Sequence, residues 1–171
     1  DETIEKNISF ELKSDLINKE KLQKCISESE LKEFIDQLEL KEKTVIGENA
    51  IKLSGGQIQR AYLAMSIAQN PNILLLDEPT TFLDIKYQIK FLESLKQLIK
   101  NNGISIITVL HDINLAARFC DRIAILKNGK LIDINTPKKV LTEFNFKKAF
   151  DIDSHILNTP VGLQLFPVSK K

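Results

Sequence analysis

The sequence is poor in the features that mark secreted, zinc-binding or membrane-spanning proteins. Only two cysteines, Cys25 and Cys120, occur in 171 residues, and they lie far apart. This spacing argues against a disulfide framework and against a zinc site. No apolar run approaches the roughly 20 residues that cross a bilayer. The first residues lack the basic start and apolar middle of a signal peptide. We therefore expect a soluble, intracellular protein with reduced thiols.

An excess of one charge is also absent. Lys and Arg together number 24, Asp and Glu number 23, and no block of like charge stands out. Proteins that bind nucleic acid usually carry a basic surface, so no nucleic-acid partner is expected. A chain of this length buries roughly 70% of its unfolded surface. That is enough for one domain, or for one domain with a small appendage.

The pattern of the chain changes near residue 70. Residues 1–45 contain no Gly or Pro and are rich in Lys, Glu, Leu and Ile, with apolar residues at helical spacing. From residue 73 onward, apolar strands alternate with amphipathic helices, as in βαβ units. We predict an α/β fold with a parallel sheet, a helical subdomain over 1–70 and the C-terminal part of an α/β core over 71–171.

The expected elements follow from this spacing. Helices are predicted over residues 3–10, 30–40, 57–70, 84–100, 113–120, 137–141 and 144–150, with a further one capped by Asn18. Strands are predicted over 73–76, 104–110, 123–126 and 130–134, with one or two more in 155–168. The strands 73–76 and 104–110 are apolar on both faces, which is typical of buried parallel strands. Two helical faces are predicted, one of Ile58, Ala61, Tyr62, Met65 and Ala68, and an inward one of Ile85, Ile89, Leu92, Leu95 and Ile99.

The stretch Leu53-Ser54-Gly55-Gly56-Gln57 precedes one helix length. Ser54 is a good N-cap, and a helix N-terminus carries a partial positive charge. The two glycines would let a phosphate approach the backbone without meeting a Cβ atom. Alone, such a stretch could be a plain capped helix. Because a second motif follows one helix later, we interpret it as a phosphate-contacting turn.

The second motif is the apolar run Ile73–Leu76, which ends in Asp77, Glu78 and Pro79. Ligands gather at the carboxyl ends of parallel strands. A carboxylate there suits Mg²⁺, which binds through carboxylates and phosphates. The next carboxylate can accept a proton from an attacking water. Asp77 is thus a candidate metal ligand and Glu78 a candidate base, and a solvated turn is the structural alternative.

Three further residues were considered for chemistry. His111 follows the second apolar strand, at the sheet edge where Asp77 is expected, and a neutral imidazole there could bind a γ-phosphate or the attacking water. Asp84 could cap the helix that begins there, which is compatible with a role at a subunit contact. His155 has no evident partner and is taken as structural.

These residues together resemble the nucleotide-binding subunit of ATP-binding-cassette (ABC) transporters. Leu53–Gln57 is similar to the family's signature motif, and Ile73–Glu78 to its Walker B strand with the catalytic glutamate. Thr81–Asp84 resembles the D-loop and His111 the switch histidine. The four motifs occur in the family's order and spacing. The resemblance therefore covers nearly the whole chain and implies a P-loop NTPase fold.

The resemblance also implies roles and partners. In this family two cassettes enclose two ATP molecules head to tail. Leu53–Gln57 and Asp84 would contact ATP and the partner cassette, Asp77 would bind Mg²⁺, Glu78 would polarise water and His111 would sense the γ-phosphate. Transmembrane permease subunits would be further partners, touched by the helical subdomain. The chain would then be cytoplasmic and peripheral on the inner face of the cell membrane.

One departure from the family is a missing phosphate loop. The pattern Gly-x-x-x-x-Gly-Lys-Ser/Thr does not occur in the sequence. We therefore expect a cassette without its N-terminal half, either the back portion of a longer protein or the product of a split or decayed gene. One of the strands 73–76 and 104–110 would then present an unpaired apolar edge. The isolated chain is predicted to be marginally soluble or to associate.

The transported substrate is indicated only by family subgroups. Residues 3–8 and 45–48 resemble exporter-type cassettes. Residues 108–122, and the continuation through 128–130 and 136–141, look like the cassettes of iron-siderophore and cobalamin importers. The importer match is longer and is favoured.

The predicted function is therefore the ATPase subunit of a transporter, possibly for iron-siderophore uptake. An alternative is a catalytically incomplete module that lends its signature in trans to a partner cassette. A DNA-repair or chromosome ATPase also pairs a signature with Walker B, but long heptad arms and a basic surface are not seen.

Overall fold

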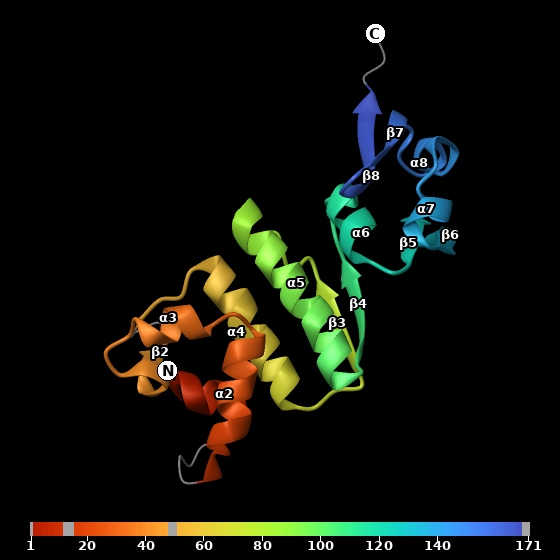
Figure 1. The fold of residues 1–171 in the computed structure, drawn as a ribbon. Helices are drawn as coiled ribbons and strands as arrows, with labels where there is room; N and C mark the ends of the chain where they lie inside the picture. The colour runs from red at the N-terminus through yellow and green to blue at the C-terminus, as the bar shows by residue number, and fades with distance from the viewer. Residues whose placement is uncertain (1, 12–15, 48–50, 169–171) are drawn as a thin grey trace. The chain divides into compact units, whose positions relative to one another are not determined.

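The structure, a computed structural model, describes residues 2–11, 16–47 and 51–168. The chain divides into two compact units, unit 1 (Asp1–Val109) and unit 2 (Leu110–Lys171). Each is described by itself (Figure 1). The predicted division into a helical subdomain (1–70) and part of an ATPase core (71–171) is a different kind of boundary, and it stays a prediction. The exporter-like residue Glu48 lies outside the described residues.

Unit 1 is built mainly from helices whose first turns are capped by side chains. The helices are α1 (Ile4–Ser9), α2 (Lys19–Glu28), α3 (Lys32–Asp36), the 3₁₀ turn η2 (Lys41–Lys43), α4 (Gly55–Ala68) and α5 (Ile85–Asn102). The side chains of Thr3, Asn18, Ser54 and Asp84 each accept a backbone N–H at a helix N-terminus. The caps predicted at Asn18, Ser54 and Asp84 are therefore confirmed.

One predicted helix of unit 1 is shorter than expected. Of the residues predicted to be helical, 30–40, only those of α3 form an α-helix, and tight turns follow it. The amides of Gln37 and Leu38 bond carbonyls three residues back, and Lys41 adopts a left-handed φ of 47°. Both features end an α-helix, because its bonds run to the fourth residue back and its φ is negative.

The strands of unit 1 form two small sheets. β1 (Glu2–Thr3) pairs antiparallel with β2 (Val45–Ile46). β3 (Ile73–Asp77) pairs parallel with β4 (Ser105–Val109), and α5 connects them. This is the predicted βαβ unit. In its register Asp77 lies beside Val109, so the carboxyl ends of the two strands are level.

The prediction that both strands are buried on both faces is wrong for the described residues. Leu74 is buried, and its neighbours on that face, Leu76, Ile106 and Thr108, are half-buried. On the other face Leu75 is 72% exposed and Ile107 62% exposed. Successive strand residues point to opposite faces. Helix α5 packs against β4 (Figure 1), and no other described element covers the second face.

The buried stripe of α5 also differs from the predicted one. Leu92 and Leu95 are buried as expected, together with Phe91 and Leu98, whereas Ile85 is 79% exposed. Ile85 is the first residue of the helix and follows the exposed cap Asp84. The apolar stripe that packs therefore begins only in the second turn of the helix.

Helix α4 is apolar on two faces. Leu63, Ala64 and Ile67 form its buried side. The face predicted from Ile58 to Ala68 is less covered, with Tyr62 59% exposed. Helices α1 and α2 both contact α4, and Figure 1 shows them gathered beside it. Both faces of α4 carry apolar residues, so the spacing along the chain could not tell which one is buried. The face predicted from the sequence is the more exposed of the two.

In its described part, residues 110–168, unit 2 contains two hairpins and three helices. Its elements are α6 (Ile113–Phe119), β5 (Ile123–Lys127), β6 (Lys130–Asn135), α7 (Pro137–Val140), α8 (Glu143–Phe150), β7 (Asp153–Thr159) and β8 (Gly162–Val168). All were anticipated within one or two residues, including β7, which begins two residues before the predicted stretch 155–168. Asn128 and Gly129 have φ of 51° and 72°, which is the hairpin turn that this dipeptide favours.

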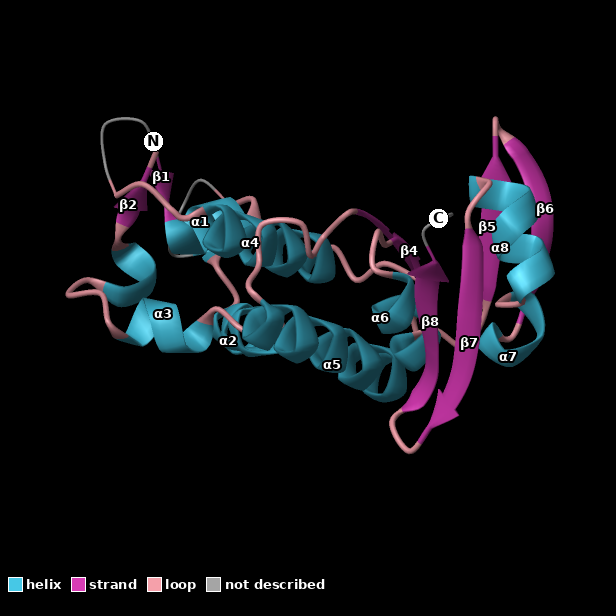
Figure 2. Ribbon diagram, turned by 90° about the horizontal axis from the view of Figure 1, so that it is seen from above, coloured by secondary structure: helices cyan, strands magenta, loops and turns pink. Residues whose placement is uncertain are grey.

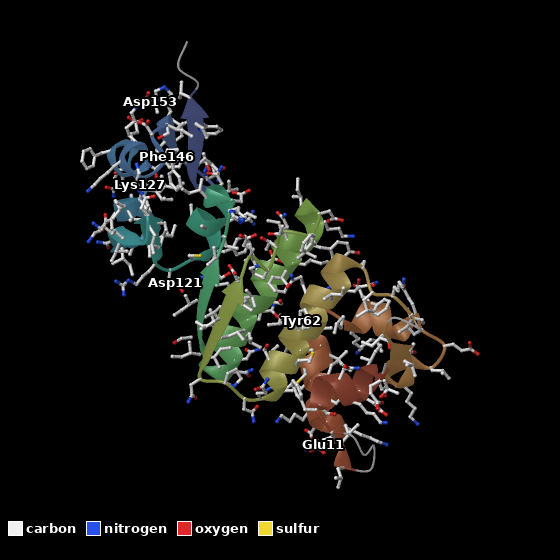
Figure 3. All side chains as sticks on the ribbon, turned by 180° about the vertical axis from the view of Figure 1, so that it is seen from behind. Glu11, Tyr62, Asp121, Lys127, Phe146 and Asp153 are labelled. Atoms are coloured by element: carbon white, nitrogen blue, oxygen red, sulfur yellow. The ribbon has the colours of Figure 1, made fainter. Side chains whose placement is uncertain are left out.

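The core of unit 2 joins its helices to the hairpin β5–β6. Ile125, Val140, Leu141 and Ala149 are buried together. Lys127, labelled in Figure 3, donates from Nζ to the Lys148 carbonyl at 2.8 Å. The two hairpins are separated along the chain by α7 and α8, and the ribbon seen from above shows both pairs (Figure 2).

Candidate functional site

The turn that begins α4 is a complete capping box. The Ser54 Oγ accepts the Gln57 amide at 3.3 Å, and the Gln57 Oε1 accepts the Ser54 amide at 2.8 Å. These two bonds fix both side chains and still leave donors for a ligand. A hydroxyl that accepts one bond keeps its O–H proton, and a glutamine whose oxygen is used keeps its NH₂ group. The turn is thus a preformed set of hydrogen-bond donors at a helix N-terminus.

The two glycines of the turn face other parts of unit 1. A Cβ at Gly55 would lie 3.0 Å from the Phe82 Cβ, and a Cβ at Gly56 would lie 2.6 Å from the Leu83 Cδ2. Gly56 is buried and Gly55 is exposed. Close packing of the loop after β3 therefore accounts for glycine at these positions. That a phosphate approaches the turn, the reason given from the sequence, stays a prediction.

The carboxyl end of β3 holds the two predicted acids. Asp77 lies on the exposed face of the strand. Glu78 follows with a left-handed φ of 47°, which turns the chain away from the strand direction. The Thr81 hydroxyl donates to the Glu78 Oε2 at 3.3 Å. The buried Pro79 and Thr80 hold the turn from beneath. The two carboxylates are therefore carried by a defined turn of the backbone.

The loop between β3 and α5 is held by side chains of α5. Asp84 caps this helix by accepting the Tyr87 amide at 3.1 Å. Gln88 donates from Nε2 to the carbonyls of Thr80 and Leu83, at 3.2 and 3.0 Å. Sequence reasoning did not identify Gln88. Its position four residues after the cap was the available signal, because such a side chain reaches back over the first turn.

The structure thus brings two of the predicted motifs together. The signature-like turn, residues 54–57, packs on the loop of residues 78–84 through Gly55–Phe82 and Gly56–Leu83. His111 lies in unit 2, before the helix α6 that Asp112 caps. The predicted grouping of His111 with Asp77 stays a prediction.

The remaining sequence predictions concern His155 and the binding of a metal ion. His155, taken as structural, has its Nδ1 3.5 Å from the Glu143 Oε1 on an exposed surface. Within the described ranges no three His, Cys, Asp or Glu side chains gather as a metal cluster. Mg²⁺ sites commonly use one or two carboxylates with substrate phosphates, and a single exposed Asp77 fits that donor set.

A groove of about 810 Å³ lies beside the more open face of α4. Side chains from α1, α3, β2 and α4 line it, and most are apolar. Among them are Ile4, Phe34, Ile46, Leu53, Ile58 and Tyr62. Tyr62 is labelled on α4 in Figure 3. Leu53, predicted as part of the signature, thus borders this groove as well as the capped turn.

Comparison with known proteins finds similarity to ABC transporter ATP-binding proteins. The model of the ABC transporter family matches residues 2–81. The petrobactin import ATP-binding protein FpuC of Bacillus anthracis is 51% identical over 104 residues, 61% of this chain and 38% of that protein. The iron(3+)-hydroxamate import ATP-binding protein FhuC of Bacillus subtilis is 45% identical over 108 residues, 63% and 40% of the two chains. The chain thus spans about two fifths of the length of these relatives.

A solved structure agrees with the fold. A bacterial Atm1-family ABC exporter with ATP bound superposes with a TM-score of 0.70 and 28% identity, over 82% of this chain and 24% of that one. In the residues that the structure describes, no helix has both the length and the apolar character to cross a bilayer. Residues 2–81 thus match the ABC transporter family model, and the chain is similar to ATP-binding proteins of iron-siderophore and cobalamin import.

Proposed function

We propose that this chain supplies the signature turn and the Walker B acids of an ABC transporter ATPase that powers iron-siderophore uptake. The observation that carries the proposal is the packing of the turn 54–57 on the loop 78–84 within one unit. The signature-like turn and the loop that follows the two acids are thereby packed together within one unit. The names of the relatives support the substrate class.

The signature turn is proposed to receive the γ-phosphate of ATP held by a second cassette. The Ser54 hydroxyl and the Gln57 amide group keep donors after forming the capping box. Gly55 is exposed, and its amide lies in the first turn of α4, where backbone donors lack intrahelical partners. These donors and the helix dipole suit a dense negative charge.

The acids at the end of β3 are proposed to handle metal and water. Asp77 would hold Mg²⁺ together with phosphate oxygens, and the ion would neutralise charge on the transferring group. Glu78 would orient and polarise the attacking water, and the Thr81 hydroxyl holds its carboxylate. His111 would contact the γ-phosphate, and Asp84 would contribute at the contact between cassettes.

The groove beside α4 is the proposed contact with the membrane subunits. It belongs to the helical segment 1–70, and its apolar lining suits a short amphipathic helix. Permease subunits docked there would keep the chain on the inner face of the membrane. This assignment gives the helical segment its proposed function as a separate subdomain, with residues 71–171 as the C-terminal part of the ATPase core.

A second candidate is a module that acts only in trans. No phosphate loop occurs in the 171 residues. Such a module would complete the ATP site of a partner cassette through Ser54–Gln57 while holding no ATP itself. The experiment that separates the two candidates is ATP binding by the purified chain, measured by fluorescence of a labelled ATP analogue. Tight binding would eliminate the trans-only module.

Activity is tested in a mixed assay. The chain is combined with a full-length siderophore-importer cassette whose own signature serine is disabled, and ATP turnover is measured. We expect the wild-type chain to restore turnover and Ser54→Arg to abolish that gain. Ser66→Ala on the same helix, whose hydroxyl donates to the Tyr62 carbonyl at 2.8 Å, is the matched control and should behave as wild type. No gain with wild type would refute the proposal.

A further inference from the structure

Arg60, three residues after the signature-like stretch, contacts three separate segments of unit 1. Its Nε donates to the Gly56 carbonyl at 3.1 Å, and its Nη1 donates to the Glu30 carbonyl at 2.9 Å. Its guanidinium carbon lies 5.2 Å from the centre of the Tyr87 ring. These contacts reach the first turn of α4, the residue that follows α2 and its C-cap, and the first turn of α5.

Only an arginine side chain can form these two hydrogen bonds and the contact with the aromatic ring at the same time. A guanidinium is always charged, and its planar fork directs several donors at fixed angles. Bonds from a charged donor to a carbonyl are stronger than neutral ones, and a guanidinium over an aromatic face adds a further attraction. Both hydrogen bonds are partly buried, so water competes less for them.

The partners of Arg60 lie where orientation matters for the proposed chemistry. Gly56 belongs to the turn that presents donors to a phosphate. Tyr87 donates its amide to Asp84, the cap of the helix that follows the loop carrying Glu78. From these placements we infer that Arg60, with Tyr87, is a positioning residue that fixes the signature turn relative to the loop of residues 78–84 and to the carbonyl of Glu30.

The inference rests on the proposed function, because it gives the turn a ligand to be positioned for. Arg60 is inferred to act through the turn, because its two hydrogen bonds go to backbone carbonyls. Its contacts with Glu30, after α2, and with Tyr87, on α5, fix the orientation of the turn. The donors of residues 54–57 are then already oriented when a γ-phosphate binds. Loss of Arg60 should therefore lower turnover more than it weakens ATP binding, because ATP is held by the partner cassette.

The first test needs the chain alone. Amide hydrogen exchange is measured by NMR at Gln57 and Ile58, whose amides bond to Ser54 Oγ and Ser54 O. Arg60→Met should speed exchange at both amides by about tenfold or more, while amides in the middle of α5 stay unchanged. Equal exchange in variant and wild type would overturn the inference.

A matched control is available in unit 2. Arg118 lies over the Phe119 ring at 5.1 Å, a similar cation–π geometry. Arg118→Met should leave exchange at Gln57 and Ile58 as in the wild type. If Arg60→Met does not fold, Tyr87→Leu removes the ring alone and should give a smaller acceleration at the same amides. Tyr87→Phe keeps the ring and should give none, and an acceleration with Tyr87→Phe would count against the cation–π contact.

The second test is the mixed assay described above. Arg60→Lys keeps a positive charge but lacks the fork, so the kcat of the assembled site should fall several-fold while the KM for ATP stays the same. An unchanged kcat would overturn the positioning role. If the wild-type chain itself gives no turnover, the proposed function fails, and the exchange measurement still decides whether Arg60 orders the turn.

Discussion

The helical layer of unit 1 and its sheet β3–β4 differ in how far they are enclosed. In the helical layer Ile8, Ile26 and Leu63 are each about 1% exposed, whereas on the sheet Leu75 is 72% exposed. Both regions carry large aliphatic side chains, although the helices alternate them with charged residues. The difference shows that a strand apolar on both faces is fully buried only when a layer covers each face, whereas an amphipathic helix needs a layer on one side only. Among the described residues, the sheet has one such layer.

The largest expected effect contrasts α5 with β3. Phe91→Ala removes a ring that is 1% exposed, and such truncations cost about 3–5 kcal/mol of unfolding free energy. Leu75→Ala should change stability by only about 0.5 kcal/mol, as exposed substitutions do. Urea unfolding followed by circular dichroism measures both. Similar losses would show that the open face of β3 is covered in solution, for instance by self-association.

The second largest loss of stability is expected where α4 of the helical layer packs on the loop that follows β3. Gly56→Ala places a Cβ against the Leu83 Cδ2, and such overpacking costs about 1–3 kcal/mol. Leu83→Ala in the same chain should relieve part of the clash, so the double variant should be more stable than the sum of the single losses. Gly55→Ala, which faces the exposed Phe82, is the control and should cost less. Strict additivity of Gly56→Ala and Leu83→Ala would argue against this contact.

The cap of α4 has a smaller expected effect. Ser54→Ala removes the Oγ that accepts the Gln57 amide, and lost N-caps cost about 1 kcal/mol. Thr142→Ala tests the equivalent cap of α8 in unit 2, where Oγ1 accepts the Asn145 amide at 3.1 Å. Thermal unfolding of the two variants should give losses of similar size. A neutral Ser54→Ala would mean that the turn is not held by its capping box.

The smallest effect concerns the thiol within the helical layer. Burial, and secondarily the Glu28 carboxylate, raises the pKa of Cys25 above its ordinary value of 9.0. The folded chain thus keeps this thiol protonated while the unfolded chain ionises it, so stability should decline slightly as pH rises past about 9. Cys25→Ala should remove that decline. Iodoacetamide should modify the half-buried Cys120 before Cys25, and faster reaction of Cys25 would show that the layer opens.

The elements were predictable because local signals act over a few residues. The caps at Asn18, Ser54 and Asp84 and the hairpin turn at Asn128-Gly129 depend on their own neighbours. Burial was less predictable. Ile85 and Leu75 are apolar, but their exposure depends on which layers lie beside them, and a pattern along the chain does not contain that information.

The sequence names candidate site residues, whose roles stay predictions, but it does not give their contacts. The motifs point to Ser54–Gln57, Asp77 and Glu78 and to candidate roles for them, and the resemblance implies the same roles. The contacts of Gly56 with Leu83 and of Arg60 with Glu30 join residues 27 and 30 positions apart in sequence. Such tertiary pairs follow from the fold and not from spacing.

The left-handed backbone at Glu78 has a consequence for how this position can change. Phe10, Asn70 and Asp151, with positive φ, follow helices, and Asn128 lies in a hairpin turn, whereas Glu78 follows a strand that pairs in parallel. Glycine would adopt this conformation without steric conflict. Glu78→Gly should therefore relieve the backbone at this turn while removing the carboxylate that the proposed function requires.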